Sequence, residues 1–559
     1  MTDIVLVQPP IRDFYLTAKR TIPYGLACIA SPLLQEGWSV EIVDALASKK
    51  SQKIEIPPEM SYLREFYAGP DISPFCMFHD YRRFGLDPES VGERVGRSAP
   101  FLVGVSSLFS AYGEEALETA ESIRDHCPGA AIVFGGHHPT AMSEEVLRHE
   151  CVDFVIRGEG EAAMPLLARA IRGEVPMESV PGIGFRTAGG RFFLNPPAVV
   201  ADLDRVPLPA SDLIDHRFYQ RGPKPSAVIA AGRGCPIGCS YCSIGCASWC
   251  GFRMKSVPRV LEEIRGAVLC RGARFIDFED ENISLKKGWF LGLLGEIGAQ
   301  FQGLGLELRA MNGLYPPSLD EEVISAMKRA GFKALNLSLC TTDREQLKRF
   351  GRPDVREDFE KALLHARQFG LDAVTYIIVG APGQDPMKSI MDLIYLAEKD
   401  AIVGVSVFYP SPGSLDFTSC AALGLLPQTL SRLRATALPI LDTTSRQDSI
   451  TLLRLSRILN FFKSLDPAER EAVLRAAANP CPQPIPERLP VAGRGEEAKK
   501  HAAARREAGK TLLGIFLRSG AIYGLSPDGR LFRHRVSDSL CREFRNRLLR
   551  VYRIDWITG

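Results

Sequence analysis

The sequence predicts an α/β protein: a doubly wound, Rossmann-like domain, then a partial (β/α)6 barrel, and finally a small α+β unit. Short apolar runs rich in β-branched residues alternate with helical apolar spacing over the first 200 residues. The same alternation returns, with longer helices, after residue 226. Because 559 residues are too many for one hydrophobic core, we expect about three domains of ~100–200 residues each.

The first domain is predicted over residues 1–200. A less regular insertion, at about 49–98, interrupts its alternation of strands and helices. Such alternation is typical of a doubly wound parallel sheet. The predicted strands are 3–9, 38–44, 101–106, 131–134 and 153–156, and the predicted helices are 24–35, 112–127, 143–149 and one that residues 158–161 open.

Three loops of this domain follow predicted strands: Ser106-Ser107, residues 135–140 and residues 158–161. Ligands of a doubly wound sheet bind beyond the carboxyl ends of its strands, where all three loops converge. The sequence therefore predicts a binding site at this edge. For His137 and His138 the alternative interpretation is that they fill a turn.

A proline-punctuated linker is predicted at 201–225, followed by a barrel at 226–415. Reactive residues of parallel barrels lie at the C-terminal ends of the strands, so these ends are where a site is expected. The predicted strands are 226–233, 274–280, 305–311, 334–339, 371–380 and 402–410, and the predicted helices are 257–270, 321–330, 357–369 and 387–398.

Three cysteines, Cys235, Cys239 and Cys242, follow the first barrel strand at CxxxCxxC spacing. Thiolates favour zinc or an iron–sulfur cluster, and a structural zinc site needs a fourth Cys or His ligand. Only three are regularly spaced here. Three ligands on a cubane leave one iron open, and that iron can bind a small molecule through an amine and a carboxylate. A zinc knuckle or plain buried cysteines remain the alternatives.

This motif resembles that of the radical S-adenosylmethionine (SAM) enzymes, whose [4Fe–4S] cluster cleaves SAM reductively to a 5′-deoxyadenosyl radical. The resemblance implies that the three cysteines are cluster ligands, and Tyr241 matches the aromatic residue that precedes the third. It also implies SAM contacts at later strand ends, although the acidic run can also be a solvated turn. These contacts are Glu279 and Asp280 for the amino group, Arg309 and Ser338 for the carboxylate and ribose, and Gly380 and Pro382 in the segment against adenine.

The three loops of the first domain resemble those of the cobalamin-binding domain that precedes many radical SAM barrels. The Asp-x-His-x-x-Gly motif is absent from this sequence, so the resemblance implies cobalamin held without a histidine from that motif on cobalt. A degenerate Rossmann-like domain that has lost its corrin is the alternative. The residues implied to line the corrin are Ser106, Ser107, Gly135, Gly136, His137, Pro139, Gly158, Glu159 and Gly160.

Other cysteines are less regularly placed. Cys246 and Cys250 follow the motif at intervals of four, and Cys340 follows the fourth barrel strand. Cys246 and Cys250 can serve as ligands of a second metal, as active-site thiols or as small buried residues, and burial is the favoured interpretation. Cys340 is a separate candidate facing the barrel mouth, and its alternative is packing.

The C-terminal part is predicted as a helical extension at 416–490 and a small α+β domain at 491–559. In the latter, strands are expected at 512–517, 521–525 and 531–536, with a turn at 526–529. This unit is basic, with 15 Lys and Arg against 7 Asp and Glu. A solvated surface is the default interpretation, and no RNA-binding signature supports a nucleic-acid partner.

The two resemblances together imply a cobalamin-dependent radical SAM enzyme with a [4Fe–4S] cluster, SAM and cobalamin as cofactors. The resemblance implies methyl transfer from methylcobalamin to an unactivated carbon of a small-molecule or peptide substrate, with an external flavodoxin- or ferredoxin-type electron donor. One alternative is a radical SAM cyclase, ring-contraction or oxidation enzyme, and another is a non-catalytic iron–sulfur or corrin-binding sensor.

The composition fits an intracellular location. Hydrophobic residues make up 45% of the chain, the formal net charge is +2, and no window predicts a membrane span. The N-terminus enters a strand without a basic n-region, so no signal peptide is predicted. Fourteen cysteines in such a chain favour a reducing cytoplasm.

Overall fold

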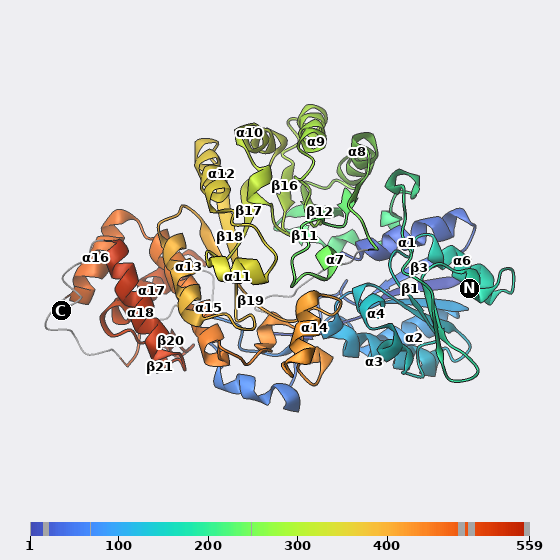
Figure 1. Ribbon diagram of the computed structural model, residues 1–559, viewed down its shortest axis with the longest axis horizontal. Helices are drawn as coiled ribbons and strands as arrows, with labels where there is room; N and C mark the ends of the chain where they lie inside the picture. The colour runs from blue at the N-terminus through green and yellow to red at the C-terminus, as the bar shows by residue number, and fades with distance from the viewer. Residues whose placement is uncertain are drawn as a thin grey trace.

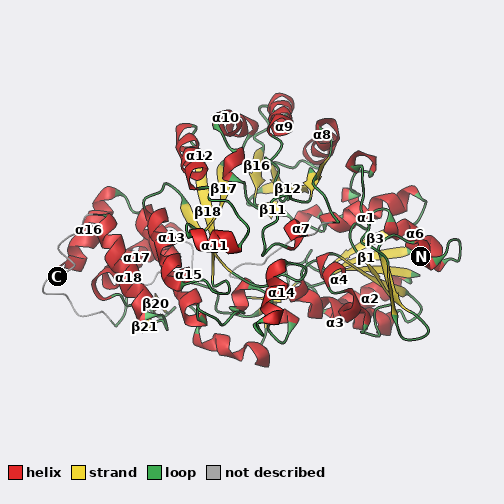
Figure 2. Ribbon diagram, in the orientation of Figure 1, coloured by secondary structure: helices red, strands yellow, loops and turns green. Residues whose placement is uncertain are grey.

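The computed structural model describes residues 2–14, 22–67, 69–246, 249–478, 487–489 and 498–552. In Figure 1 the N-terminal sheet lies at one end of an elongated molecule, the barrel lies in the middle, and the C-terminal helices lie at the opposite end. Figure 2 shows the strands gathered in the N-terminal and middle parts, with helices around them. The predicted α/β class is confirmed.

The N-terminal domain is built on a seven-stranded sheet of order β10-β9-β8-β7-β6-β1-β3. The five strands predicted from the sequence are all present and parallel. They are β1 (Ile4–Gln8), β3 (Val40–Asp44), β6 (Leu102–Ser106), β7 (Ala131–Gly135) and β8 (Phe154–Ile156). Two strands without a sequence prediction, β9 (Ile183–Arg186) and β10 (Phe192–Leu194), add an antiparallel edge.

Helices cover both faces of this sheet. Ile4 and Leu6 pack with buried residues of α1 (Tyr24–Gln35) and α6 (Ala163–Ile171). Val5 and Val7 point to the other face, because successive strand residues alternate. There they pack with residues of α2 (Pro88–Ser98), α3 (Gly113–His126) and α5 (Ser143–Leu147). The doubly wound architecture is therefore confirmed.

The insertion forms a small antiparallel sheet of order β2-β5-β4, with a 3-10 segment between two of its strands. Its apolar side chains, such as Met60 and Phe75, join the same hydrophobic core as the barrel. The insertion thus ties the two domains together. Its elements are β2 (Ile11–Asp13), β4 (Ser51–Lys53), β5 (Arg82–Phe84) and the 3-10 segment Pro58–Glu65.

The barrel has its six predicted parallel strands in sequence order. They form two sheets that isolated bridges, Leu308 with Phe332 and Leu314 with Leu337, connect. The strands are β12 (Lys224–Ile229), β15 (Phe275–Phe278), β16 (Glu307–Ala310), β17 (Ala334–Cys340), β18 (Asp372–Val379) and β19 (Ile402–Val407). The helices are α8 (Val257–Arg265), α9 (Lys287–Gln300), α10 (Glu321–Ala330), α12 (Arg356–Gln368) and α13 (Pro386–Ala397).

The strand predicted at 512–517 is wrong, because these residues lie in helix α17 (Ala498–Ser519). Leu512, Leu513 and Phe516 are buried together, which the helical spacing of i, i+1 and i+4 explains. The predicted hairpin is confirmed by β20 (Tyr523–Leu525) and β21 (Leu531–Arg533), whose turn carries a hydrogen bond from Gly529 N to Ser526 O of 2.9 Å. The other helices of the C-terminal part are α15 (Arg446–Ser464), α16 (Pro467–Ala478) and α18 (Asp538–Val551).

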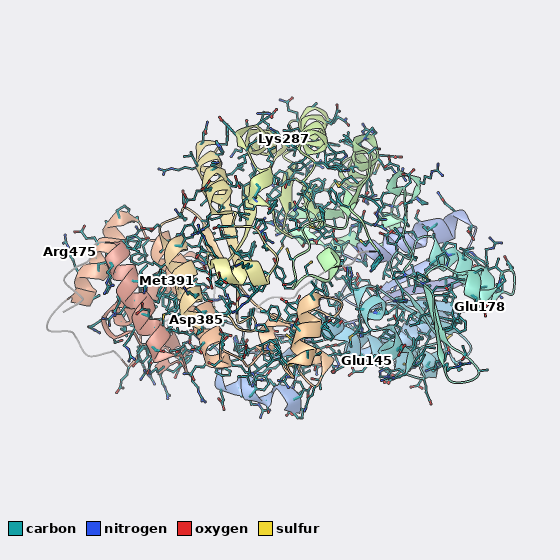
Figure 3. All side chains as sticks on the ribbon, in the orientation of Figure 1. Glu145, Glu178, Lys287, Asp385, Met391 and Arg475 are labelled. Carbon is teal, nitrogen blue, oxygen red and sulfur yellow. The ribbon has the colours of Figure 1, made fainter. Side chains whose placement is uncertain are left out.

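Charged side chains cover the outside of the molecule, as Lys287 and Arg475 illustrate in Figure 3. None of the helices in the described ranges has the length and apolar character that a bilayer crossing needs. The C-terminal helices share one continuous hydrophobic core with the barrel. The barrel and the C-terminal unit are therefore packed as one body.

Candidate functional site

The three motif cysteines lie in a loop that a two-stranded antiparallel ribbon closes. The ribbon pairs β13 (Gly232–Arg233) with β14 (Arg253–Met254). Gly234 has a φ of +81°, and a Cβ there would lie 2.5 Å from the carbonyl oxygen of Gly251. Only glycine fits both the left-handed conformation and this close approach. Gly234, which directly precedes Cys235, is therefore needed for the ribbon to close the loop.

Hydrogen-bond donors reach the sulfur atoms of Cys242 and Cys239. Gly245 N, in the short helix α7 (Ser243–Cys246), donates to Cys242 Sγ at 3.4 Å. Arg352 Nη1 donates to Cys239 Sγ at 3.6 Å. Such donors stabilise thiolate sulfur and tune iron–sulfur clusters. Burial raises the pKa of the Cys235 and Cys242 thiols, so a metal has to displace their protons.

The three motif sulfurs are not gathered as closely as the ligands of a single metal ion. Four sulfur ligands around zinc at about 2.3 Å lie about 3.8 Å apart. Among the described residues, the trio of His, Cys, Asp and Glu side chains with ligand atoms within 4.8 Å of one another is Glu89, Glu93 and His126. The cysteines are more widely spread than that. Three thiols on one loop with N–H···S donors are a suitable donor set for a [4Fe–4S] cluster.

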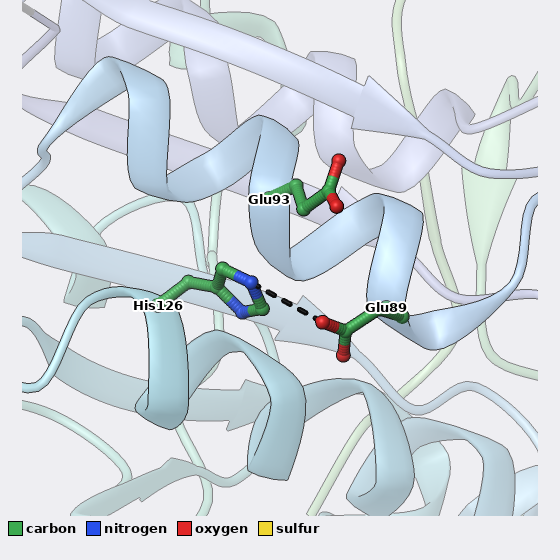
Figure 4. A group of neighbouring side chains, drawn as sticks. All are labelled: Glu89, Glu93 and His126. Carbon is green, nitrogen blue, oxygen red and sulfur yellow. Dashed lines mark ion pairs between the residues drawn. The ribbon is translucent and has the colours of Figure 1, made fainter.

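The trio that does come together lies on two neighbouring helices of the N-terminal domain, α2 and α3 (Figure 4). His126 Nε2 lies 3.3 Å from Glu89 Oε1 across α2 and α3. All three side chains are at least partly exposed. An ordinary surface ion pair explains this contact.

Arg352, which sequence reasoning missed, connects three predicted site residues. Besides Cys239, its guanidinium donates to Tyr241 Oη at 2.9 Å and to Ser338 O at 3.3 Å. Tyr241 packs edge-on against Phe350 at 5.0 Å between ring centroids. The arginine follows α11 (Arg344–Arg349), beyond the fourth barrel strand. The sequence signal that could have pointed to Arg352 is its place as a basic residue after the fourth barrel strand.

The acidic run after β15 contains Glu279, Asp280 and Glu281, and the first two were predicted as SAM contacts. Asp280 is buried, and its oxygens accept hydrogen bonds from Ala231 N at 3.0 Å and Gly232 N at 2.6 Å. Burial raises the pKa of Asp280 to about 7. Glu279 is exposed, while its backbone N donates to Ile229 O at 3.0 Å. Asp280 therefore holds the base of the cysteine ribbon, and Glu279 points outward at the barrel mouth.

Arg309 lies inside the barrel. Its Nε donates to Asp277 Oδ2 at 2.9 Å, and its guanidinium lies 5.1 Å from the ring centroid of Phe275. The neighbouring residues of the same strands, such as Phe278, face the helices and belong to the hydrophobic core. The role of Arg309 toward a SAM carboxylate stays a prediction, since its guanidinium already pairs with Asp277.

The glycine segment after β18 is shaped by the C-terminal extension. Gly380 has a φ of +76°, and a Cβ there would lie 3.0 Å from Ser449 Oγ in α15. Gly383 N donates to Asp442 Oδ2 at 2.6 Å. Pro382, between them, is half-buried. The glycine segment is thus held on one side by Ser449 and Asp442, which belong to the C-terminal extension.

Three predicted corrin-loop residues pack against one another at the edge of the N-terminal sheet. Gly136 has a φ of +120°, and a Cβ there would lie 2.6 Å from Ser107 O. Ser107 Oγ lies 2.8 Å from Nδ1 of His138, which is buried, and burial lowers the pKa of His138 to about 4. His137 is exposed. Ser106 and Gly135 are paired partners at the ends of β6 and β7.

One detail of this edge corrects the sequence analysis. Residues 137–141 form the short helix α4 (His137–Ala141), where a loop was expected. Pro139 and His138 are buried in that helix, so His138 fills the interior and only His137 faces outward.

The third loop carries its glutamates toward the barrel. Gly158 has a φ of +81°, and a Cβ there would lie 2.3 Å from Ala198 O, while Gly160 lies against Ile29. Arg253 donates to Glu159 through Nη1 at 3.0 Å and Nη2 at 2.7 Å. The corrin-contact role of Glu159 stays a prediction, and its carboxylate binds arginine in this structure.

The barrel's last loop brings the two sites together. A Cβ on Gly413 would lie 3.5 Å from Ala141 Cβ in α4 and 3.7 Å from Ser243 Cβ in α7. The histidine helix of the sheet edge and the helix of the cysteine loop therefore meet at one point.

Of the remaining cysteines, Cys250 and Cys340 are buried. Cys340 packs with Phe350 and Phe408 in a small hydrophobic cluster, in agreement with the packing interpretation. The side chain of Cys246 and all of Cys481 lie outside the described residues.

Family comparisons match both domains. The family described as B12 binding domain matches residues 78–168, and the Radical SAM superfamily matches residues 229–394. An uncharacterized methyltransferase of Pyrococcus horikoshii is 26% identical over 387 residues, which cover 68% of this chain and 74% of that protein. An anaerobic magnesium-protoporphyrin IX monomethyl ester cyclase of Synechocystis sp. is 26% identical over 69% of this chain and 70% of its own length.

A solved structure shares the whole architecture. The cobalamin-dependent S-adenosylmethionine radical enzyme OxsB, with aqua-cobalamin and S-adenosylmethionine bound, aligns with a TM-score of 0.63 at 14% identity. The alignment covers 99% of this chain and 80% of that chain. At this identity the likeness concerns the fold.

Proposed function

Because the chain belongs to the radical SAM superfamily and carries a B12 binding domain ahead of its barrel, we propose that it is a cobalamin-dependent C-methyltransferase. The observation that carries the proposal is the meeting of the cysteine-loop helix and the histidine helix at Gly413. A radical methylation needs its two cofactor sites to lie close together, and this contact between the two predicted sites supports the proposal.

The residues then have separate tasks. Cys235, Cys239 and Cys242 would hold the cluster, and Glu279 at the barrel mouth would accept a hydrogen bond from the SAM ammonium. When bound, the cluster and SAM supply an adenosyl radical, and the corrin supplies a transferable methyl group. Arg352 fixes Tyr241 beside Cys239.

The corrin would lie on the loops that contain Ser107, Gly136 and Gly158, where close backbone approaches leave room for glycine only. We propose a small-molecule or peptide substrate and an external one-electron donor of the flavodoxin or ferredoxin type. Free thiols in this number fit a reducing cytoplasm, which we propose as the location.

The test uses the full chain, reconstituted anaerobically with iron, sulfide and hydroxocobalamin, and supplied with SAM that carries a CD3 group. After reduction, we expect 5′-deoxyadenosine in solution and the CD3 label on the extracted corrin, both by mass spectrometry. Cys239→Ala should abolish the deoxyadenosine and the cluster absorbance. Cys250→Ala, a matched buried cysteine outside the motif, should retain both. Corrin that stays unlabelled would contradict methyl transfer.

A second candidate is a radical SAM cyclase or oxidation enzyme that transfers no methyl group. The similarity to the Synechocystis cyclase favours it. The same experiment separates the two candidates, because this enzyme would form 5′-deoxyadenosine and bind corrin without labelling it.

A further inference from the structure

The ribbon that closes the cysteine loop carries two like charges at its base. Its register places Arg233 directly opposite Arg253. Like charges opposite one another in an antiparallel pair are destabilising. Both side chains are largely buried, with 24% and 16% of their surface exposed. The ribbon therefore requires counter-charges from another part of the molecule.

The N-terminal domain supplies these counter-charges. Arg253 donates to both oxygens of Glu159, Arg233 Nη1 lies 3.4 Å from Glu159 Oε1, and Arg233 also pairs with Glu161. The two glutamate side chains are only 10% and 8% exposed. We call these four residues the interdomain bridge.

The barrel side of the bridge is itself held in place. Lys255 N donates to Ala231 O at 2.8 Å, and Lys255 Nζ donates to Glu263 at 2.8 Å. Asp280 accepts hydrogen bonds from the two backbone groups that precede Arg233. Arg233 lies two residues before Cys235, so a movement of the bridge moves the first cysteine.

The N-terminal side is equally constrained. Glu159 Oε2 accepts a hydrogen bond from Val200 N at 2.5 Å, and Gly158 and Gly160 fit closely against Ala198 and Ile29. The same loop follows β8 at the carboxyl edge of the sheet, where the corrin is proposed to bind. The bridge is thus a short, rigid connection between the two cofactor sites.

We propose that Glu159 and Glu161 are positioning residues that dock the B12-binding domain on the cysteine loop and so set the separation between cluster and corrin. This inference rests on the proposed function, because it needs both cofactors. In this proposal the two glutamates pair with arginines of the barrel and do not contact the corrin.

The experiment measures that separation directly. The full chain, loaded with both cofactors and reduced, contains two paramagnets, the cluster and cob(II)alamin, whose magnetic dipolar coupling depends on their distance. Pulsed EPR on the wild type should give one narrow distance distribution. Glu159→Gln/Glu161→Gln should give a broader distribution at longer distance, with unchanged iron and corrin content.

Two variants sharpen the result. The charge exchange Glu161→Arg/Arg233→Glu should restore a narrower distribution than Arg233→Glu alone. Lys287→Gln, which breaks a surface ion pair on the outer side of the barrel, is the matched control and should leave the distribution as in the wild type. If the double glutamate variant loses the cluster, Glu161→Gln is measured in its place.

The outcomes are distinguishable. A glutamate variant with the wild-type distribution overturns the positioning role and leaves the proposed function intact. A glutamate variant that loses corrin specifically, with the cluster and its EPR signal unchanged, shows that the glutamates are corrin contacts and also overturns the positioning role. A wild type that binds no corrin overturns the proposed function, and the inference with it.

Discussion

Two acidic runs at strand ends, one in each main domain, have opposite surroundings. Glu159 and Glu161 follow β8 of the N-terminal sheet, and arginines of the barrel neutralise them. Glu279 and Asp280 follow β15 of the barrel; Asp280 binds its own domain's backbone, and Glu279 is exposed. The first run joins domains, whereas the second closes a loop and leaves one acid at the barrel mouth.

This difference teaches that a carboxylate at the ligand edge of a parallel sheet is not by itself a ligand contact. Both runs lie where ligands bind in such folds. The carboxylates of the two runs differ in the hydrogen-bond donors that their oxygen atoms contact. A buried carboxylate needs such donors, because burying it without hydrogen bonds costs free energy. Glu159, Glu161 and Asp280 are largely buried and accept hydrogen bonds from the protein, whereas Glu279 is exposed.

The largest expected effect tests the bridge. Glu159→Gln/Glu161→Gln removes the carboxylates that pair directly with two mostly buried guanidinium groups, and removing one partner of a buried pair costs about 3–5 kcal/mol. We expect a clear fall in the denaturation midpoint of the anaerobically reconstituted protein. Lys287→Gln should stay within about 0.5 kcal/mol of wild type. Equal midpoints for both variants would show that the bridge is only a solvated contact.

The second-largest effect is expected for Glu279, the exposed acid of the run after β15. Glu279→Gln should weaken SAM binding by about 10- to 150-fold, since a charge-assisted hydrogen bond contributes about 1.5–3 kcal/mol. Titration of SAM into the reduced protein, followed by the EPR signal of the cluster, measures the affinity. Unchanged stability is the control. A wild-type titration would place the SAM amino group elsewhere.

Asp280 should behave in the opposite way. Asp280→Asn keeps one oxygen acceptor and faces the second backbone N–H with an amide donor, which costs about 1–3 kcal/mol of stability. SAM affinity, measured by the same titration, should stay close to wild type. If instead the affinity falls as it does for Glu279→Gln, the ammonium contact belongs to the buried acid.

Much of this architecture could be predicted from the sequence. Short apolar runs rich in β-branched residues, alternating with helical apolar spacing, identified the five parallel strands and the six barrel strands, because burial selects those patterns directly. The run 512–517 was misassigned because a short apolar stretch fits a strand and a buried helix equally well. The spacing of Cys235, Cys239 and Cys242 pointed to the cysteine loop.

The partners of the site residues could not be predicted. Arg352 lies 113 residues from Cys239 along the chain, and Arg253 lies 94 residues from Glu159. Such pairings arise from tertiary packing, and single arginines carry no spacing signal. The sequence therefore located the acids at their strand ends, while only the structure shows which of them pair with arginines or backbone N–H groups of the protein.

The smallest expected effect is a pH dependence that separates the two runs. The pKa of Glu159 is lowered: burial raises it, but the hydrogen bond from Arg253 and the charge of Arg233 outweigh that effect. Its stabilising contribution is therefore complete above its usual value of 4.5 and is lost only as pH falls through the lowered pKa. The contribution of Glu159 should therefore not change between pH 5 and pH 8.

Asp280 should titrate in that range. Burial raises its pKa from 3.8 to about 7, so its contribution is complete below 3.8 and is lost as pH rises through about 7. For one proton the slope is at most about 1.4 kcal/mol per pH unit. Denaturation midpoints at pH 5, 6, 7 and 8 should therefore fall more steeply for the wild type than for Asp280→Asn. Asp392, whose pKa burial raises to about 6, titrates in both proteins and cancels in the difference. Parallel curves would mean that Asp280 is already ionised at pH 5 and that its two backbone hydrogen bonds outweigh its burial.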